Sequence, residues 1–435
     1  MLIGSNLVAL ISRMLSSVIL TRLLDAAAFG TVAIITTFSF IIVMLTDLGF
    51  YQYTVRSPRM DEEGFLDKVW TVRLTRDVAI TVIFVLLSGT MASYVRDPGL
   101  QLAFAITSLT LITDGLSSMA FATAARSGKV GRLSLLDLIP VIVTIFLSIG
   151  FAYILRSYWA LIISGVLGSV LKLFLSYYMF PGSGRQLRFD KSVFIDIWKF
   201  GRFIVPSSVI TMLLGQSDKF LLIRYFSIGQ FGLYSLASTL ASAPSNLMNS
   251  YTSRILYPAF SSPDNRTSDL SRLFYEFGSK TRLLFIFLSC ILITSAPVLV
   301  AILYDDRYLG AAQYLSILLV SAVVNFVIST ETDMMIASGH VHWQLYLNIL
   351  RLMMYAASSI TLFHFMGVIG LIWAIALTTV AIKFVTTIVM SYLGIARLYN
   401  EVIFLVVAFT GGTLGTGVVL VGRAIWPAIP LPFAG

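Results

Sequence analysis

Thirteen long apolar segments recur along this sequence of 435 residues, and they constrain its fold more than any other feature. An apolar run of 18 or more residues with few charges is long enough to cross the hydrocarbon core of a bilayer. The segments lie at residues 2–23, 28–50, 70–94, 101–124, 135–155, 159–180, 199–217, 231–253, 282–304, 311–335, 344–364, 368–391 and 402–422. Each must be a helix, because an isolated strand would leave backbone groups unpaired in lipid. The sequence therefore predicts an all-α polytopic membrane protein.

The composition excludes several other classes of protein. Only 12% of the residues are charged and 57% are hydrophobic, whereas a soluble domain carries about 25% charged residues. The segment Leu2–Leu20 has no basic leader or small-residue cleavage site, which predicts a first membrane helix rather than a signal peptide. The single cysteine, Cys290, excludes an intrachain disulfide, and His340, His342 and His364 are too few and scattered for a metal centre. We expect no cofactor.

Basic residues at the ends of the segments predict the orientation. With a cytoplasmic N-terminus, 19 of them fall on the cytoplasmic side and 7 on the outer side. The cytoplasmic set is Arg56, Arg59, Lys68, Arg73, Arg76, Arg126, Lys129, Arg132, Arg185, Arg188, Lys191, Lys199, Arg202, Arg254, Arg266, Arg272, Lys280, Arg282 and Arg397; the outer set is Arg22, Arg96, Arg156, Lys219, Arg224, Arg307 and Arg423. Their spread over many helix ends explains most of the net charge of +9 and argues against nucleic-acid binding.

Two short matches indicate an internal repeat. The first, at an offset of 202, aligns Thr21–Leu24 and Phe29-Gly30 with Ile223–Phe226 and Phe231-Gly232. The second, at an offset of 211, aligns Ser127–Val130 with Ser338–Val341, and it places Asp137 opposite Asn348. Because each match joins the same-numbered segments of a six-helix set, we expect two homologous lobes with the same orientation in the membrane.

The repeat defines the expected organisation of the chain. Residues 1–180 form the N-lobe, residues 181–198 a cytoplasmic linker with an amphipathic basic stretch, and residues 199–395 the C-lobe. Residues 396–435 hold a thirteenth helix and a tail, whose role the sequence leaves open. Two parallel six-helix lobes of this kind enclose a central cavity, where the substrate path runs.

Polar residues at helical spacing predict the lining of that cavity. The candidates are Asn6, Arg13, Ser17, Asp114, Asp218, Asn246, Asn249, Asn325, Arg351 and Lys383. Arg13 and Asp114 lie near the middle of their segments, where an ionisable side chain is costly and usually functional. The alternative for the Ser and Thr residues around them is that they join helices by hydrogen bonds. Arg351 and Lys383 also lie close enough to a segment end for their long side chains to reach the lipid headgroups.

Three acidic residues are candidates for ion coupling, and four prolines for bending. Asp47, Glu331 and Asp333 lie near segment ends, where they either bind a coupling ion or cap a helix. Pro140, Pro206, Pro244 and Pro297 fall inside predicted helices, where each removes a backbone hydrogen bond and favours a kink. Such a kink either allows a lobe to bend during transport or is a fixed feature of the packing.

Several motifs resemble those of Wzx-like polysaccharide exporters, which belong to the multidrug/oligosaccharidyl-lipid/polysaccharide (MOP) exporter superfamily. The resemblance rests on Arg22-Leu23-Leu24-Asp25 with Phe29-Gly30, Asp47-Leu48-Gly49, Gln216-Ser217-Asp218, Gly232–Ala237 and Ser338-Gly339. It covers roughly residues 1–395, and the thirteenth segment departs from the usual twelve-helix plan.

The resemblance implies a flippase that moves a polyprenyl-diphosphate-linked oligosaccharide across the bacterial inner membrane, driven by Na⁺ or H⁺. It also implies a polysaccharide polymerase and glycosyltransferases as functional partners. The diphosphate needs cationic partners, which Arg13, Arg351 and Lys383 offer. The alternatives are a lipid II flippase, a multidrug/cation antiporter of the same superfamily, and a membrane glycan polymerase. The short outward connections argue against the polymerase, which usually needs a sizeable outward loop. The sequence does not identify the sugar or the coupling ion.

Overall fold

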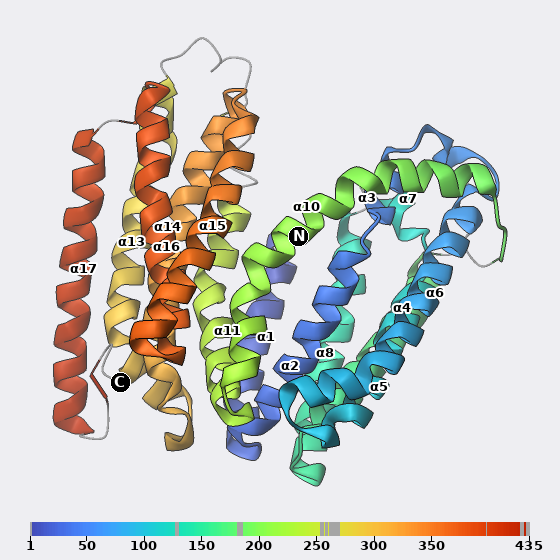
Figure 1. The fold of residues 1–435 in the computed structure, drawn as a ribbon, viewed down its shortest axis with the longest axis horizontal. Helices are drawn as coiled ribbons and strands as arrows, with labels where there is room; N and C mark the ends of the chain where they lie inside the picture. Colours follow the sequence, from blue (N-terminus) through green and yellow to red (C-terminus); the bar gives the residue numbers. More distant parts are fainter. Residues whose placement is uncertain are drawn as a thin grey trace. The chain divides into compact units, whose positions relative to one another are not determined.

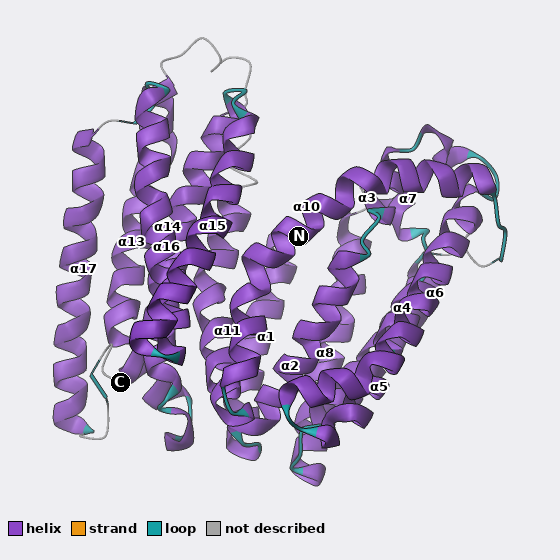
Figure 2. Cartoon of the chain, in the orientation of Figure 1, coloured by secondary structure: helices purple, strands orange, loops and turns teal. Residues whose placement is uncertain are grey.

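The structure, a computed structural model, describes residues 2–126, 130–180, 186–252, 256, 260, 270–396, 398–426 and 430–431. Within these residues every regular element is a helix (Figure 2). Helical residues make up most of each of the thirteen segments predicted to cross the membrane. The prediction of an all-α fold is therefore confirmed.

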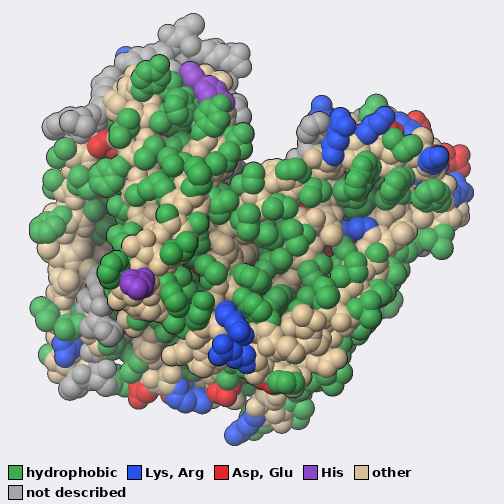
Figure 3. Space-filling view, viewed as in Figure 1, with side chains coloured by type: hydrophobic (Ala, Val, Ile, Leu, Met, Phe, Trp, Pro, Cys, Tyr) green, Lys and Arg blue, Asp and Glu red, His purple; other side chains and the backbone are tan. Residues whose placement is uncertain are grey.

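Ten helices of the described chain are long and apolar enough to cross a membrane. An eleventh span is counted if the bent pair Lys191–Arg202 and Ile204–Tyr225 forms one span. Large apolar side chains are exposed on many of these helices, and Leu86, Ile154 and Phe365 are more than 70% accessible. Such side chains cover the flanks of the helices in Figure 3. Lipid is the solvent in which so much exposed apolar surface is stable.

The chain divides into two compact units, residues 1–229 (unit 1) and residues 230–435 (unit 2). The boundary lies after helix α10, Lys191–Tyr225, because α10 packs against helices of unit 1. The homology of residues 1–180 and 199–395 stays a prediction.

Unit 1 contains ten α-helices and two short 3₁₀ turns within its described residues (Figure 1). Their bounds are α1 Leu2–Leu23, α2 Ala26–Leu45, α3 Phe50–Arg56, η1 Pro58–Asp61, α4 Phe65–Val95, η2 Pro98–Leu100, α5 Gln101–Thr107, α6 Leu109–Leu116, α7 Phe121–Arg126, α8 Val130–Leu155, α9 Trp159–Met179 and α10 Lys191–Tyr225.

The predicted helix over residues 101–124 is divided into α5, α6 and α7. Ser117 adopts an extended conformation after α6, with φ −61° and ψ 142°. The backbone N–H of Ser118 then donates to the Ser176 hydroxyl of α9 at 3.0 Å, and the Ser118 hydroxyl accepts from the Ala120 N–H at 3.1 Å. Serine side chains compete with the helix for backbone hydrogen bonds in this way, which is why apolar periodicity did not predict the break.

A sharp connection joins α2 to α3. The Asp47 side chain accepts a hydrogen bond from the Gly49 N–H at 2.9 Å, and Gly49 has a φ of +69°. A side chain at residue 49 would be strained at this φ and would also press on Phe200 and Ile204 of α10. Glycine therefore lets α10 pack closely against the connection.

Helix α10 bends by 44° between Arg202 and Ile204. Pro206 lies inside the helix and has no N–H to donate to the carbonyl of Arg202, so the bend falls where a backbone hydrogen bond is missing. The half before the bend is amphipathic. Val193 and Ile197 are buried in a core cluster with Phe65 and Met119, so this half lies over the ends of α3, α4 and α7 (Figure 1).

The described residues of unit 2 form six long helices and one short 3₁₀ turn, η5 Asp306–Tyr308. The helices are α11 Ile228–Tyr251, α13 Leu270–Leu303, α14 Ala311–Ala337, α15 Val341–Met366, α16 Val368–Tyr392 and α17 Leu398–Ile425. Helix α14 is the most enclosed, since 72% of its membrane-length window is buried. It packs against α13, α15 and α16.

The thirteenth predicted segment is helix α17, which packs along α13. A Cβ atom at Gly411 would lie 2.7 Å from the Phe287 carbonyl oxygen, and one at Gly415 would overlap Thr294. The Thr294 hydroxyl also lies 3.2 Å from the Gly412 carbonyl oxygen and donates to it. Small residues four apart let two membrane helices approach closely in this way. Helix α17 is therefore an integral part of unit 2.

Candidate transport site

Four charged side chains of α4 and α6 form a cluster in unit 1. The Arg73 guanidinium lies 2.6 Å from an Asp114 carboxylate oxygen and 3.6 Å from Asp77. Arg76 lies 2.6 Å from the other oxygen of Asp77. Arg73 and Asp77 are buried, whereas the side chain of Asp114 is 59% exposed. This unit 1 cluster carries two positive and two negative charges, so its net charge is zero.

The C-terminal end of α2 also holds this cluster. Arg76 donates to the carbonyl oxygens of Val43 and Thr46, at 2.9 and 3.2 Å, and to the Thr46 hydroxyl at 2.9 Å. The last carbonyls of a helix have no partner within the helix and carry partial negative charge, which favours a cation there. Gly115 allows α6 to approach, because a Cβ atom at this position would lie 2.6 Å from the Cβ of Asp77.

A second cluster lies in unit 2 and joins four helices. The Lys383 ammonium of α16 lies 2.6 Å from Glu331 of α14 and 3.0 Å from Glu401 of α17. It also donates to the Thr387 hydroxyl at 2.6 Å. The Tyr275 hydroxyl of α13 donates to the second Glu401 oxygen at 3.1 Å. Glu331 is the most buried of these groups, with 1% of its side chain exposed.

Arg282 of α13 adds a second cation to the unit 2 cluster. It is 1% exposed, donates to the Phe274 carbonyl oxygen at 2.7 Å, and stacks over the Phe274 ring at 3.8 Å. The rings of Tyr275 and Phe404 are also within 6 Å, close enough for cation–π attraction. Arg282 contributes to the electrostatic field at Glu331. With Lys383, Glu331 and Glu401, the unit 2 cluster is also neutral.

The structure gives different surroundings to the predicted cavity cations. Lys383 is held by two carboxylates, so its charge is already balanced. Among the described residues, Arg13 of α1 and Arg351 of α15 take part in no ion pair. Arg13 is exposed and Arg351 is half-buried.

The other predicted polar residues fall into three groups. Asp114 pairs with Arg73, and Asp47 accepts from the Ser208 hydroxyl at 3.2 Å, which links the connection between α2 and α3 to α10. Ser17 donates to the Met14 carbonyl oxygen of its own helix at 2.7 Å. Asp333, Asn325 and Asp218 are half-buried and Asn246 is exposed, while the side chains of Asn6 and Asn249 lie outside the described residues. The roles of all these residues stay predictions.

Sequence reasoning missed most of both clusters. The charge distribution places Arg73, Arg76 and Arg282 at loop ends, and no pattern in the sequence predicts a role for Asp77 or Glu401. One signal was present in the sequence: Val72-Arg73-Leu74 and Thr281-Arg282-Leu283 are 209 residues apart, between the two repeat offsets. Both arginines are buried. An arginine that recurs at the offset of the internal repeat, inside an apolar helix, is better interpreted as a buried charge with a partner than as a residue of a loop.

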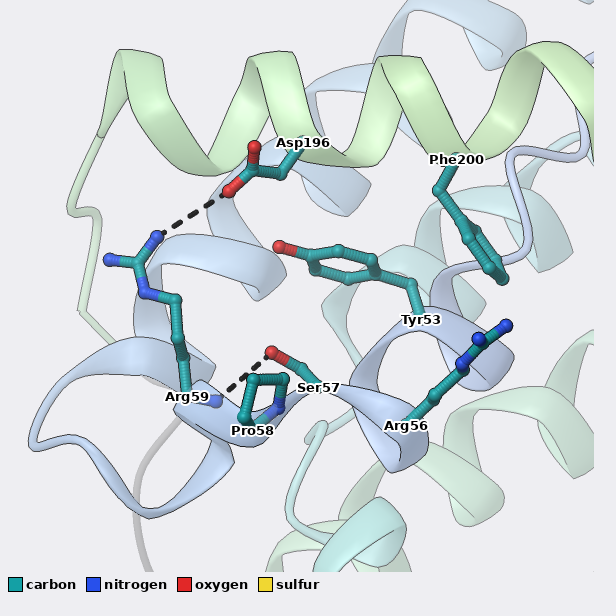
Figure 4. Close-up of a pocket in the computed structure, with 7 residues that line it drawn as sticks. All are labelled: Tyr53, Arg56, Ser57, Pro58, Arg59, Asp196 and Phe200. Atoms are coloured by element: carbon teal, nitrogen blue, oxygen red, sulfur yellow. Dashed lines mark hydrogen bonds and ion pairs between the residues drawn. The ribbon is translucent and has the colours of Figure 1, made fainter.

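A small pocket lies beside α3 and the first half of α10 in unit 1 (Figure 4). Its volume is about 280 Å³, and its lining is Tyr53, Arg56, Ser57, Pro58, Arg59, Asp196 and Phe200. Arg59 lies 3.6 Å from Asp196 on one side of the Tyr53 ring, and Arg56 points away on the other side (Figure 4). Burial and the charge of Asp196 raise the pKa of the Tyr53 hydroxyl. Drug-sized ligands need roughly 300–1,000 Å³, so this pocket is too small for an oligosaccharide.

Next to this pocket, Asp190 fixes the start of α10. Its carboxylate accepts from the Ser192 N–H at 2.8 Å as the helix cap, and its second oxygen lies 2.7 Å from the Lys68 ammonium of α4. The hydrogen bonds from Lys68 and Ser192 hold the pKa of the Asp190 carboxyl well below its usual range. The linker is thereby tied to α4.

Comparison with known proteins connects this architecture to a family. Residues 19–313 match the family described as "Polysaccharide biosynthesis protein". The lipopolysaccharide biosynthesis protein WzxC of Escherichia coli (strain K12) is 20% identical over 263 residues, which is 59% of this chain and 52% of WzxC. The matched part of this chain therefore corresponds to about half the length of WzxC.

Two solved structures share the fold along almost the whole chain. The lipid II flippase MurJ, in an inward closed conformation, gives a TM-score of 0.74 at 14% identity and covers 96% of this chain and 92% of its own. An inward-facing multidrug resistance MATE family transporter of the MOP superfamily gives 0.64 at 16% identity and covers 91% and 94%. Both likenesses concern the fold, which this chain shares with a flippase and with a multidrug transporter. With the family match over residues 19–313, the chain belongs to the polysaccharide biosynthesis protein family.

Proposed function

We propose that this protein is a flippase that moves polyprenyl-diphosphate-linked oligosaccharide repeat units across the bacterial inner membrane for surface polysaccharide synthesis. The observation that carries the proposal is the family match over residues 19–313, on a fold that is shared with a lipid II flippase. The transport cycle is alternating access, and the N-terminus is cytoplasmic. A polysaccharide polymerase and glycosyltransferases act after and before it on the same lipid-linked intermediates.

Arg13 and Arg351 supply the charge that recognises the diphosphate. A guanidinium binds phosphate oxygens through paired, charge-assisted hydrogen bonds. An arginine within a membrane helix is costly unless a partner balances it, and neither of these two has an ion pair within the described chain. The diphosphate provides the missing negative charge. Lys383 is a weaker candidate, because Glu331 and Glu401 already balance its ammonium.

The variant Arg13→Ala tests this proposal in cells that lack the chromosomal copy of the gene. We expect surface polysaccharide to be lost and lipid-linked oligosaccharide to accumulate, while the amount of protein in the membrane stays unchanged. Arg22→Ala is the matched control, because Arg22 is an exposed residue in the last turn of the same helix. Export at the normal level by Arg13→Ala would remove Arg13 from the substrate path.

A lipid II flippase is the second candidate, because MurJ shares the fold at a TM-score of 0.74. The two functions differ in the effect that loss of the protein has on growth and on surface polysaccharide. A repeat-unit flippase leaves cells viable without surface polysaccharide, whereas a lipid II flippase stops cell-wall synthesis and growth. If cells stop growing as the protein is depleted while their surface polysaccharide stays normal, the protein is a lipid II flippase instead.

A further inference from the structure

The Lys383 ammonium in the unit 2 cluster has no hydrogen-bonding capacity left. A lysine ammonium has three N–H donors, and these point to Glu331 Oε1, Thr387 Oγ1 and Glu401 Oε2 at 2.6, 2.6 and 3.0 Å. Glu401 also accepts from Tyr275 through its other oxygen. Both oxygens of Glu401 are therefore satisfied.

Glu331 is satisfied on one side only. Its Oε2 atom is buried and has no hydrogen-bond partner within the described residues. A buried carboxylate oxygen without a donor is strongly unfavourable, because it has lost its water and gained nothing in exchange. A metal ion bound to the oxygen, or a proton added to the carboxylate, would each reduce the uncompensated negative charge at this position without moving the helices.

The surroundings favour a proton over a metal ion. Lys383 and Arg282 already place two positive charges beside the carboxylates, and a metal ion would be repelled by both. Na⁺ and similar hard cations need several oxygen ligands, but Lys383 occupies Glu331 Oε1 and Glu401 Oε2. No group of three His, Cys, Asp or Glu side chains in the described chain is arranged to hold a metal.

We infer that Glu331 is a proton-binding site in unit 2 and that Lys383 and Glu401 are its switchable counter-ions; this rests on the proposed flippase function, for which it supplies the coupling ion. Protonation forms one O–H bond at Glu331 and converts a hydronium ion to water. Neutral Glu331 no longer balances Lys383, so the ammonium pairs with Glu401 alone. The tie between α14 and α16 weakens, and the tie between α16 and α17 strengthens.

Exposure shows how a proton reaches this site. The side chains of Lys383 and Glu401 are 19% and 15% exposed, whereas that of Glu331 is 1% exposed. A proton from water therefore meets Glu401 first. Lys383 then gives one of its three protons to Glu331 and takes the new proton from Glu401, so the ammonium is restored. The charged groups around Glu331 are Lys383 from α16, Glu401 from α17 and Arg282 from α13, and α15, which also packs on α14, carries Arg351.

Infrared difference spectroscopy of the full chain in lipid nanodiscs tests the site directly, with pH as the variable. We expect a band of a protonated carboxyl group that grows as the pH falls, is lost in Glu331→Gln and remains in Glu62→Gln, an exposed residue of unit 1. Lys383→Met should raise the midpoint of its titration by about one to three pH units, and Glu401→Gln should lower it. A double variant, Glu331→Gln with Lys383→Met, removes both charges and repeats the test if the single variant is not recovered.

Polysaccharide export by the same variants separates this inference from the proposed function. An unchanged band in Glu331→Gln, or midpoints that do not move in opposite directions, would overturn the proton site. Loss of the band with normal export would overturn its coupling role. If the band belongs to Glu331 but a deletion strain still makes surface polysaccharide, the proposed function fails and the proton site stands.

Discussion

Individual residues in this protein act mainly through charge, and burial decides what each charge does. Arg73 and Asp77 of the unit 1 cluster are buried together, so removal of one leaves the cluster with an unbalanced buried charge, at a cost of roughly 3–5 kcal/mol. Asp114 in the same cluster is 59% exposed, so water can solvate its carboxylate if Arg73 is removed. Exposure therefore separates a structural charge from one that a ligand can approach.

The Asp190–Lys68 pair gives a prediction at this scale about pH. The pKa of Asp190 is lowered, so the stabilisation is present above the unfolded value of about 3.9 and is lost as the pH falls toward the folded value. The Asp190→Asn variant keeps the helix cap, since asparagine and aspartate are equally good caps. We expect this variant to lower the thermal midpoint of the purified protein at neutral pH, and the difference from the wild type to shrink steadily below about pH 4. A difference that stays constant in acid would show that the ion pair is not its source.

At the scale of elements, the packing of α17 on α13 is the feature most open to test. Gly415 approaches Ile291 and Thr294, so a Leu side chain there must push the helices apart, whereas Gly417 has no heavy atom within 4 Å of its Cβ position. Gly415→Leu should destabilise the protein by roughly 1–3 kcal/mol or more through overpacking, and Gly417→Leu should have little effect. The thermal midpoint of each variant in detergent measures this difference.

The same substitution connects the element to function. If α17 moves away from α13, Glu401 withdraws from Lys383, and the unit 2 cluster loses one of its two anions. Gly415→Leu should therefore also reduce polysaccharide export. Equal stability and equal export for the two glycine variants would mean that close contact with α13 is not needed.

At the scale of the whole molecule, the unequal distribution of basic residues predicts a cytoplasmic N-terminus. The prediction can be tested by labelling single cysteines with a membrane-impermeant maleimide, after Cys290 is replaced by Ser. Ser192→Cys, at the start of α10, should react only in inverted membrane vesicles. Arg307→Cys, between α13 and α14, should react in intact spheroplasts. The reverse pattern would invert the topology and the direction of transport.

Much of the fold follows from the sequence alone, and the reason is physical. A bilayer accepts only long apolar helices, so hydropathy predicted a helix at every one of the thirteen positions, and motifs indicated the family. The end of the second helix near Gly49 was predicted, but the break at Ser117 was not, because local hydrogen bonds from Ser side chains, rather than apolar periodicity, produce it.

The sequence by itself determined that this protein is helical and lies in a membrane, and it pointed to transport, because these properties depend on local composition and on short motifs. Only the tertiary structure decided which charges meet. Lys383 is 52 residues from Glu331 and 18 residues from Glu401 along the chain, yet both carboxylates lie within 3.0 Å of its ammonium group. A sequence does not show whether a cation has an ion-pair partner. Only the packing shows that Lys383 has two such partners, whereas Arg13 has none among the described residues. The thirteenth helix, which the sequence left without a role, contributes Glu401 to that balance.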